Sequence, residues 1–594
     1  MAKLIYFVFA ILSVVGTARL ALGLRTEHIS TSPGYIVAWE ITDASTRNAT
    51  ITFDLTVQTT GFVGFGISKN GGMGGADIVI GGVFPNGTAY FSDRYAPGNG
   101  FPPVDTSQDW VLHSALENDT HTVLRVSRLL DTCDLEGDVV ITRDTFRYIW
   151  SIGATDDIEY HGSDNRGSYA VNILADAYPD VDLSLFDTFD AITNITLPSK
   201  DTTYWCTVHR SPVFNGKQHA VAFGPVLLGP ASKHSHHLSL YSCTPPEGED
   251  PVEFFEKYIT QGGIDCLEPE PGSISAYRYC TELVYTFTIG GRIMHMPEGV
   301  GFPIGEDTNM YYLMESHFDN PDQLSDVTFE TGVRIYHTSD LRPIEAGVMR
   351  IGQMYDYNFV IPPSSTNYVV VGHCSSNCTS QWVPAEGVDI FNVMLHSHAY
   401  GTKMKVRQFR NGTEQPWVLN DDNYDNDYQD NRNIPLVKFM PGDQMAIECH
   451  YDNSMLSPPS GVLGGFGTRR EMCEVVYYYY PKMGLENCRS NILKQNILNF
   501  FGVSVEEIDD SLTNPIITAP PPLAGLRFLE YINLIVWNDV VRGQLEQLMR
   551  YSLHEEQCGG DGFQKMAQEE TYYVTYPEIV EEYVPPNSEC PTQN

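Results

Sequence analysis

Six side chains of this sequence are of the types that bind copper, and they fall into two sets of three. Imidazole binds copper in either valence, whereas a methionine thioether favours Cu(I). Zinc makes little use of methionine, so a set of two histidines and one methionine indicates copper that is reduced during its work. The sequence therefore predicts two copper sites in one chain. The first set is His236, His237 and His317, and the second is His396, His398 and Met472.

The spacing of these histidines supports the two sets unequally. Residues two apart on a β-strand share a face, so His396 and His398 in VMLHSHAYG can bind one metal. In SKHSHHLSLYSC the same rule favours His234 with His236, because His236 and the adjacent His237 point to opposite faces of a regular strand. A pair of neighbours needs a β-bulge or a strand end. Both alternatives remain open at this point, and for Met472 taken alone core packing is favoured over copper binding.

Short runs of alternating apolar and polar residues, separated by Gly, Pro and Asn, must position these ligands. From about 30 to 180 they predict an antiparallel β-sandwich, and from 200 to 350 and 355 to 500 two further sandwiches of jelly-roll type. After the Pro-rich segment ITAPPPLAGLRF, residues 523–553 carry helical periodicity, and an acidic tail from Glu569 looks extended and pinned by Cys590. The domains that we expect are a signal peptide at 1–23 and regions 30–190, 200–352, 353–500 and 501–594.

The first residues and the cysteines indicate the secretory pathway. An apolar run from Leu4 to Gly16 follows Lys3, and small residues lie near Ala21 and Gly23, as in a cleaved signal. No later segment reaches the length of a membrane span. Twelve cysteines, an even number, suggest up to six disulfides in an oxidising compartment. We expect a secreted or lumenal protein, in a secretory granule, the endoplasmic reticulum or outside the cell. Glycosylation sequons lie at Asn48, Asn86, Asn118, Asn194 and Asn411, and Asn377 matches with a cysteine in its middle position.

The acidic composition excludes nucleic acid as a partner. The chain has 75 Asp and Glu against 36 Lys and Arg, a formal charge of −39, whereas binding to a polyanion requires a basic surface. A small cationic substrate would instead be attracted. The alternative is that the charge serves solubility in a calcium-rich or acidic compartment.

Four blocks of the sequence resemble the copper type II, ascorbate-dependent monooxygenases, the family that includes dopamine β-hydroxylase and the peptide-amidating enzymes. The blocks occur in the family's order between about 200 and 500, and residues 30–180 resemble the DOMON domain of the dopamine β-hydroxylase branch. The four blocks are HHLSLYSC (236–243), GFPIG…YYLMESHFDNP (301–321), HSHAYGTKMKVRQFRNG (396–412) and GGFGTRREMC…YYYYP (464–481).

The resemblance implies a mainly β fold, with a DOMON β-sandwich, two jelly-roll-like copper domains and a short, partly helical C-terminal region. It implies an electron-relay copper at His236, His237 and His317, and a copper where O2 and substrate meet at His396, His398 and Met472. His234 then becomes a neighbour of the first site. Ascorbate would be the reductant, and an activated C–H bond of a small molecule such as an aromatic amine would be hydroxylated. The implied disulfides are Cys206–Cys266, Cys243–Cys280, Cys374–Cys488, Cys378–Cys558, Cys449–Cys473 and Cys133–Cys590.

Departures from the family pattern bear on the substrate. Where the peptide-amidating branch grips a carboxylate with Arg, Asn and Tyr, this chain has Met394, Glu474 and Val476, so peptide amidation is not expected. Val476 also departs from dopamine β-hydroxylase, which has the Tyr. Glu315, two residues before His317, is a candidate anchor for a substrate ammonium group. The alternatives for Glu315 are an outward-facing carboxylate or a hydrogen-bond partner of His317.

Two aspartates of the DOMON-like region, Asp77 and Asp109, resemble acidic positions that bind a cation in related domains, and with main-chain oxygens they could hold Ca²⁺. Ordinary turn-capping aspartates are the alternative. Two rival functions also remain: a secreted copper-binding protein without turnover, and an adhesion protein built on the DOMON sandwich. The sequence leaves a homodimer open.

Overall fold

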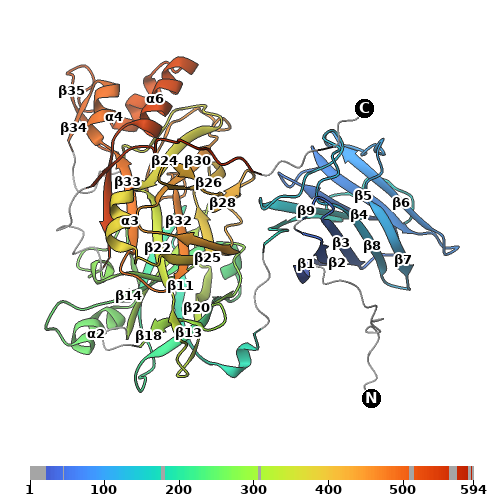
Figure 1. Ribbon diagram of the computed structural model, residues 1–594, viewed down its shortest axis with the longest axis horizontal. Coiled ribbons are helices and arrows are strands. Elements are labelled where there is room, and N and C mark those ends of the chain that lie inside the picture. Colours follow the sequence, from blue (N-terminus) through green and yellow to red (C-terminus); the bar gives the residue numbers. More distant parts are fainter. Residues whose placement is uncertain are drawn as a thin grey trace. The chain divides into compact units, whose positions relative to one another are not determined.

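Strands far outnumber helices in the computed structural model, which describes residues 22–44, 46–175, 181–305, 310–506, 514–560, 572–585 and 590 (Figure 1). The predicted signal segment lies outside the described residues up to residue 21. No helix in the described ranges is long and apolar enough to cross a membrane. The chain divides into two compact units, the first comprising 1–142, 147–169 and 588–594, and the second 143–146 and 170–587.

Two five-stranded antiparallel sheets form the first unit. Exposed and buried residues alternate along the strands at Gly34–Thr42 and Thr50–Val57, because one face of their sheet packs inward. Phe53 meets Phe65 and Tyr148 at ring-centroid distances of 5.1 and 5.8 Å, which joins the two sheets through an aromatic core. The first sheet has the order β1 (Leu22–Thr31), β2 (Gly34–Thr42), β3 (Thr50–Val57), β8 (Thr122–Leu129), β7 (Val111–Glu117), and the second β10 (Arg166–Val171), β9 (Phe146–Ile152), β4 (Val63–Ser68), β5 (Ala76–Val83), β6 (Ala89–Ala96).

The second unit begins with two sheets that enclose a common apolar core. One has the order β11 (Asp187–Thr196), β20 (Thr328–Thr338), β13 (Gln218–Leu227), β18 (Val300–Ile304), β21 (Ile344–Glu345), with β17 (Met294–His295) paired to β13. The other has the order β15 (Ile264–Asp265), β12 (Thr202–Arg210), β19 (Tyr311–Asp319), β14 (Ser235–Cys243), β16 (Cys280–Thr288). The predicted boundary at residue 190 therefore falls inside a strand.

The remaining large sheets of the second unit enclose another apolar core. A seven-stranded sheet has the order β29 (Arg432–Phe439), β25 (Val388–His396), β32 (Glu474–Tyr480), β22 (Gly347–Gln353), β33 (Asn487–Ile492), β36 (His554–Gly559), β37 (Tyr572–Val574). Facing it are β24 (Tyr368–Cys374), β30 (Gln444–Tyr451), β26 (Gly401–Arg410) and β27 (Thr413–Glu414), with β28 (Leu419–Asp421) paired to β26. Small pairs are β23 (Val360–Ile361) with β31 (Val462–Leu463), and β34 (Ser504–Glu506) with β35 (Ile516–Ala519).

The two halves of the second unit pack directly on each other. Phe391, Met394 and Val476, on β25 and β32, belong to the apolar core of the first half. The hydroxyl of Tyr478 accepts a hydrogen bond from the backbone N–H of Thr286 on β16, at 3.1 Å. The sheet containing β14 and β19 therefore lies against the sheet containing β25 and β32, and this contact positions the candidate site.

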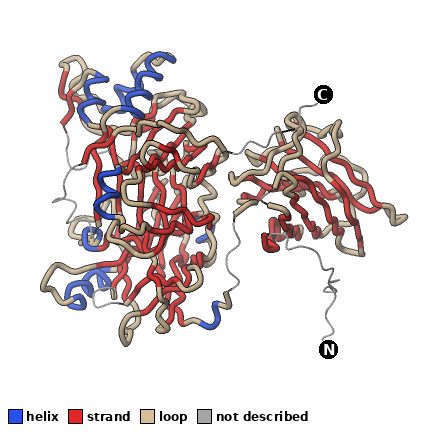
Figure 2. Tube along the Cα trace, viewed as in Figure 1, coloured by secondary structure: helices blue, strands red, loops and turns tan. Residues whose placement is uncertain are grey.

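Helices are short and few in the described ranges (Figure 2). The predicted helical stretch at 523–553 consists of two helices, α5 (Phe528–Leu534) and α6 (Asp539–Tyr551), whose residues Phe528 and Leu545 pack into the second core. The other helices are α1 (Ala231–His234), α2 (Pro251–Gln261), α3 (Ser376–Trp382) and α4 (Lys494–Phe501), with single 3₁₀ turns at Leu183–Leu185 and Tyr277–Tyr279.

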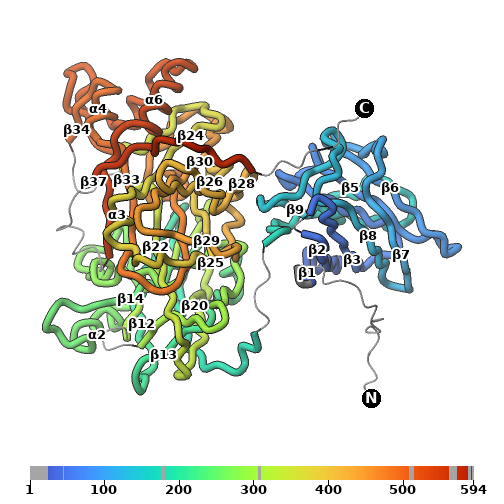
Figure 3. Tube along the Cα trace, in the orientation of Figure 1, coloured from blue at the N-terminus to red at the C-terminus, as the bar shows by residue number. Residues whose placement is uncertain are grey.

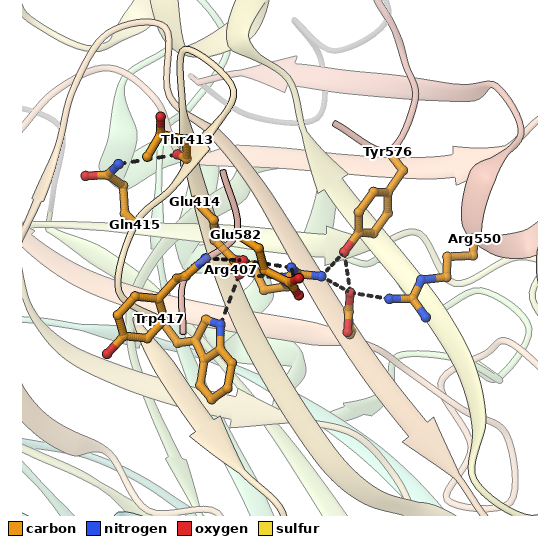
Figure 4. A network of polar contacts seen from close by, with 10 residues as sticks. Arg407, Thr413, Glu414, Gln415, Trp417, Arg550, Tyr576 and Glu582 are labelled. Carbon is orange, nitrogen blue, oxygen red and sulfur yellow. Dashed lines mark hydrogen bonds and ion pairs between the residues drawn. The ribbon is translucent and has the colours of Figure 1, made fainter. Parts of the chain in front are cut away.

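The described part of the tail after β37, residues 575–585, runs along the second unit without a helix or a long strand (Figure 3). The backbone N–H of Val580 donates to the carbonyl of Gly412 at 2.9 Å, and Arg407 links Glu414 to Tyr576 of the tail (Figure 4). All six disulfide pairs implied by the resemblance are confirmed. The predicted fold class is also confirmed. The six disulfides fit a secreted or lumenal compartment, where thiols are oxidised.

Candidate copper centres

A β-bulge brings His236, His237 and His317 together. In the pairing of β14 with β19, Ser235 lies opposite Phe318 but His237 lies opposite His317, so His236 is an extra residue without a partner in the ladder. A bulge turns the added residue away from strict alternation, and the two adjacent histidines can then face one metal. One ring nitrogen from each of the three side chains lies within 4.8 Å of the others. The structure thus provides the bulge that the sequence argument required.

His234 lies outside this group. Helix α1 ends at His234 and strand β14 begins at Ser235, so the strand rule that paired His234 with His236 does not apply. The Nδ1 of His234 hydrogen-bonds the carbonyl of Asp319 at 3.1 Å, and its ring stacks on Phe329 at 5.9 Å. The prediction of a His234–His236 chelate is therefore wrong, because a helix end replaces the expected strand.

His396 and His398 lie at the end of a strand, and a buried carboxylate shapes the turn between them. Strand β25 ends at His396. The backbone N–H of His398 donates to Glu471 at 2.9 Å, and the hydroxyl of Ser397 and the N–H of Tyr400 donate to the same carboxylate. Because Glu471 directly precedes Met472, one residue couples the histidine turn to the methionine. Burial raises the pKa of Glu471 to about 7, and the backbone donors oppose this shift.

The two sets of ligands adjoin. Ring centroids of His237 and His396 are 5.6 Å apart, and those of His317 and His398 are 6.3 Å apart. The Nδ1 of His396 meets the amide oxygen of Gln429 at 2.7 Å, which leaves its Nε2 for a metal. Five imidazoles from three strands, β14, β19 and β25 with the turn after it, thus form one cluster between the two halves of the second unit.

The loop after β31 belongs to the second half of the second unit and contacts His317, which lies in the first half. The Nε2 of His317 meets the hydroxyl of Thr468 at 3.0 Å. Tyr204 stacks on the His317 ring at 4.5 Å and donates its hydroxyl to the carbonyl of Phe466 at 2.7 Å. Residues 466–468 thereby fix the orientation of a histidine that the other half supplies.

Burial keeps these imidazoles neutral, the form that binds metals. It lowers the pKa of His236 to about 4, and the pKa values of His237, His317, His396 and His398 are also lowered, chiefly by burial. Both ring nitrogens of His236 and the Nε2 of His398 are buried without a hydrogen-bond partner among the described residues. Unpaired buried imidazole nitrogens are donors that copper prefers, and the thioether of the buried Met472 is another, so the residue types fit this metal.

A cavity of about 330 Å³ opens beside the cluster, with His237, His396 and Met472 in its wall. Its lining also includes Glu315, Glu474, Arg350 and Arg489, together with aromatic and apolar side chains. Glu315 is 6% exposed, so the alternative of an outward-facing carboxylate is wrong. The cavity is also lined by Met394, Val476, Tyr204, Tyr241, Tyr277 and Tyr355.

Asp77 and Asp109 of the first unit share no group of three close metal-ligand side chains among the described residues. The indole N–H of Trp110 donates to Asp77 at 2.7 Å, and the guanidinium of Arg128 forms a fully buried ion pair with the same carboxylate. One carboxylate oxygen from each of Asp77, Asp93 and Asp138 lies within 4.8 Å of the others. A calcium site at Asp77 and Asp109 stays a prediction, and Arg128 supplies the positive charge beside Asp77.

Several residues that shape the site were not predicted from the sequence. Glu471 directly precedes Met472, but nothing in the sequence shows that its carboxylate is buried and accepts backbone N–H groups. Gln429 and Thr468 lie in loops without any motif, and only the fold brings them to the imidazoles. Arg350 and Arg489, which line the cavity, were also not predicted. The sequence-based prediction considered only the absence of an arginine at position 394.

Comparison with known families gives three matches along the chain. A DOMON domain model matches residues 31–153. The models described as copper type II ascorbate-dependent monooxygenase, N-terminal domain and C-terminal domain, match residues 190–325 and 344–501. The three models follow one another without overlap.

Similar proteins extend over most of the chain. "DBH-like monooxygenase protein 1" of Homo sapiens is 33% identical over 88% of this chain and 84% of its own length. "MOXD1 homolog 2" of Drosophila melanogaster is 33% identical over 90% of this chain and 71% of its own. "Dopamine beta-hydroxylase" of Homo sapiens is 27% identical over 89% of this chain and 83% of its own.

Proposed function

The chain belongs to the copper type II ascorbate-dependent monooxygenases, and we propose that it hydroxylates an activated C–H bond of a small aromatic amine, with O2 and ascorbate. The observation that carries the proposal is one cavity whose wall combines His237, His396 and Met472 with the buried carboxylate Glu315. A substrate in this cavity would then be within reach of both a redox metal and an anchor for its positive charge.

We assign one copper to His236, His237 and His317 and another to His396, His398 and Met472. Copper bound there supplies one-electron transfer from ascorbate and activation of O2. The chain holds the ligands in place: Gln429 fixes His396 through Nδ1, Glu471 fixes the turn to His398, and Tyr204 fixes the plane of His317. The thioether at Met472 distinguishes the two sites in their preference for Cu(I).

Glu315 is the carboxylate best placed for a substrate ammonium group. The other cavity acid, Glu474, lies 3.8 Å from Arg350 and 4.0 Å from Arg489, and Tyr355 donates its hydroxyl to it. Glu315 forms no ion pair with the described residues and receives a hydrogen bond from Tyr277. Both guanidinium groups lie within 4.0 Å of Glu474 and balance that acid. Burial raises the pKa of Glu315 to about 7, although the hydrogen bond from Tyr277 and the charge of Arg350 oppose this shift. A substrate ammonium group bound beside Glu315 would stabilise its ionised form.

The remaining walls favour an aromatic body. Tyr204, Tyr241, Tyr277 and Tyr355 line the cavity with Val476 and Met394. Flat rings pack against such walls through offset or edge contacts. A cavity of about 330 Å³ lies at the small end of the usual range for ligand sites. A single-ring amine therefore suits the space better than a peptide.

The test is product formation by purified, copper-loaded protein from a panel of phenylethylamines, with hydroxylation followed by mass spectrometry. Matched ring compounds that bear a carboxylate in place of the amine complete the panel. Hydroxylated amines with no hydroxylated acids would support the proposal. Hydroxylation of the acids in preference to the amines would contradict the ammonium anchor and point to Arg350 and Arg489 instead.

The same panel tests Glu315 directly. Removal of its charge in Glu315→Gln should raise KM for amines by about tenfold or more, the scale of one lost charge-assisted hydrogen bond, with a smaller effect on kcat. The exposed acid Glu253 on α2 provides the control, because Glu253→Gln should leave KM unchanged. An unchanged KM in Glu315→Gln would remove Glu315 from substrate binding.

A further inference from the structure

Two arginines in the wall of the cavity beside the histidine cluster have no ligand assigned to them so far. Arg350 lies on β22 and Arg489 on β33, and both line the cavity. Their side chains are only 15% and 11% exposed. A guanidinium group that is largely removed from water is costly unless other groups match its charge and its N–H donors. The partners of these two groups therefore bear on what the cavity binds.

The register of the seven-stranded sheet places both arginines on the same face as a copper ligand. His396 on β25 pairs with Glu474 on β32. Gly352 on β22 pairs with Glu474 on one side and with Arg489 on the other. Arg350 lies two residues from Gly352 on the same strand, so it shares this face. Neighbouring strands are about 4.8 Å apart, so Glu474 lies one strand from His396, and the two arginine side chains approach Glu474.

The two guanidinium groups make few hydrogen bonds. Each guanidinium has five N–H donors. Among the described residues, the Arg350 side chain donates once, from Nε to the amide oxygen of Asn487 at 3.1 Å. The Arg489 side chain donates to none of them, and its Nε is buried. Because buried donors are ordinarily paired, the unused N–H groups indicate a ligand with acceptor oxygens.

The acids of the cavity do not use up these donors. Glu474 lies 3.8 Å from Arg350 and 4.0 Å from Arg489, which is beyond hydrogen-bond distance, and it accepts the hydroxyl of Tyr355. Asp356 also lines the cavity but pairs with Lys494 at 3.0 Å. A small anion whose oxygens lie between the two arginines would accept the unused hydrogen bonds.

We propose that Arg350 and Arg489 bind the reductant, the ascorbate monoanion, through its enediolate oxygens. This inference deepens the proposed function, because it rests on reduction of the protein by ascorbate, but it does not depend on which substrate is hydroxylated. The planar fork of a guanidinium group suits adjacent oxygens of one ligand. The rings of Tyr241 and Tyr355 lie 5.8 Å from Arg350 and 5.3 Å from Arg489, where they offer flat walls to the ring of ascorbate.

The location suits an electron donor. Glu474 is the strand neighbour of His396, and His237 lines the same cavity, so a donor at the arginines adjoins ligands of both copper sites. Each ascorbate monoanion gives one electron to Cu(II) and releases its remaining enediol proton to water, which leaves the ascorbyl radical anion and Cu(I). A cavity of about 330 Å³ is small for a ligand site, so the reductant leaves before the substrate enters.

The test measures ascorbate binding without turnover. Full-length protein is loaded with Cu(I) and titrated with ascorbate in a calorimeter under anaerobic conditions, where ascorbate binds but transfers no electron. Arg489→Met and Arg350→Met should each raise the dissociation constant by about tenfold or more, the scale of one lost charge-assisted hydrogen bond. Arg489→Lys keeps the charge but not the fork, so its loss should be smaller.

A second measurement follows the loss of the Cu(II) signal in electron paramagnetic resonance when ascorbate is added anaerobically. The ascorbate concentration for half-maximal rate should rise in Arg489→Met by the same factor as the dissociation constant. Hexaammineruthenium(II), a cationic reductant, should reduce the parent and this variant at similar rates, because its approach does not need the arginines. Equal slowing with both reductants would overturn the proposal, since the copper sites themselves would then have changed.

Arg334→Met is the matched control, because Arg334 lies on β20 with a side chain 43% exposed and pairs with Asp190 at 2.7 Å. Copper content and unfolding temperature are measured for every variant. Unchanged ascorbate affinity in both cavity variants would overturn the proposal, and so would an equal loss in Arg334→Met. A ring compound with a carboxylate that loses affinity in Arg489→Met while ascorbate does not would also overturn it. No substrate is present in these measurements, so a protein that hydroxylates none of the amines leaves their result unaffected.

Discussion

At the scale of single residues, the copper cluster depends on side chains that hold ligands rather than bind metal. Glu471 accepts three hydrogen bonds from the turn at Ser397–Tyr400 and directly precedes Met472. The candidate ligands themselves could be predicted from their types and from the resemblance. Glu471 and Gln429 could not, because a carboxylate or an amide in a loop has no recognisable spacing until the fold supplies its partner.

The methionine gives the sharpest prediction at this scale. Met472→Leu conserves volume in a buried position but removes the sulfur. Turnover should fall by about 100-fold or more, because even partners outside the ligand shell cost 10–100-fold at metal sites. Copper bound by His236, His237 and His317 should remain, as measured by metal content and by the spectrum of the bound ion. Full activity in Met472→Leu would show that the sulfur is not a ligand.

A buried histidine far from the cluster predicts how stability depends on pH. Burial lowers the pKa of His554 to about 4 from its ordinary 6.5. Between these values the unfolded chain binds a proton that the folded chain excludes, so stability falls on acidification from pH 6.5 toward pH 4. The slope from this residue is at most about 1.4 kcal/mol per pH unit.

His554→Asn tests this slope, because asparagine cannot titrate but keeps a donor for the carbonyl of Ser552, which His554 contacts at 2.9 Å. Denaturant unfolding of the second unit at a series of pH values should show a shallower acid slope in this variant. His28→Asn, at an exposed position, should keep the parent slope. Identical slopes in the parent and His554→Asn would contradict the assignment.

At the scale of elements, the strand pattern was a good guide where alternation is regular and a poor one at the site. Strands β2 and β3 follow period two along their whole length. At the copper site, helix α1 ends at His234, strand β14 begins at the next residue, and the β-bulge follows directly at His236. A bulge has no local sequence signature, so the alternation rule selected His234, and only the resemblance corrected it.

The hairpin β26–β27 and the C-terminal tail are joined by a buried charge network (Figure 4). Arg407 donates to both oxygens of Glu414 at 2.6 and 2.9 Å and to Glu448 at 3.0 Å, and Tyr576 and Arg550 also contact Glu448. Removal of one partner from a buried network leaves the others unpaired. Arg407→Met should therefore lower the free energy of unfolding of the second unit by about 3–5 kcal/mol.

Lys438→Met is the control for this prediction. Lys438 pairs with Asp389 at 3.2 Å, but its side chain is 45% exposed, and surface pairs contribute about 0–1 kcal/mol. Denaturant unfolding with the disulfides intact measures both variants. Equal, small losses in Arg407→Met and Lys438→Met would show that the tail network adds no stability.

At the scale of the whole molecule, the mainly β fold and the family were predictable, but the joining of the two copper regions was not. Each half of the second unit has its own alternating strands, which is the pattern that the sequence displays. The contact that brings His237 to within 5.6 Å of His396 depends on residues such as Phe391 and Tyr478, which look like ordinary core residues of one sheet. A pattern within one segment carries no information on which face of it meets another segment.

The most direct test of the monooxygenase assignment is the origin of the oxygen in the product. Copper-loaded protein, ascorbate and the amine that reacts best in the panel are incubated under isotopically heavy O2, and the product is analysed by mass spectrometry. We predict one heavy oxygen atom in each hydroxylated product, with ascorbate oxidised in proportion, and no product from Met472→Leu. A protein that holds copper at both sites but forms no labelled product from any amine would contradict the account.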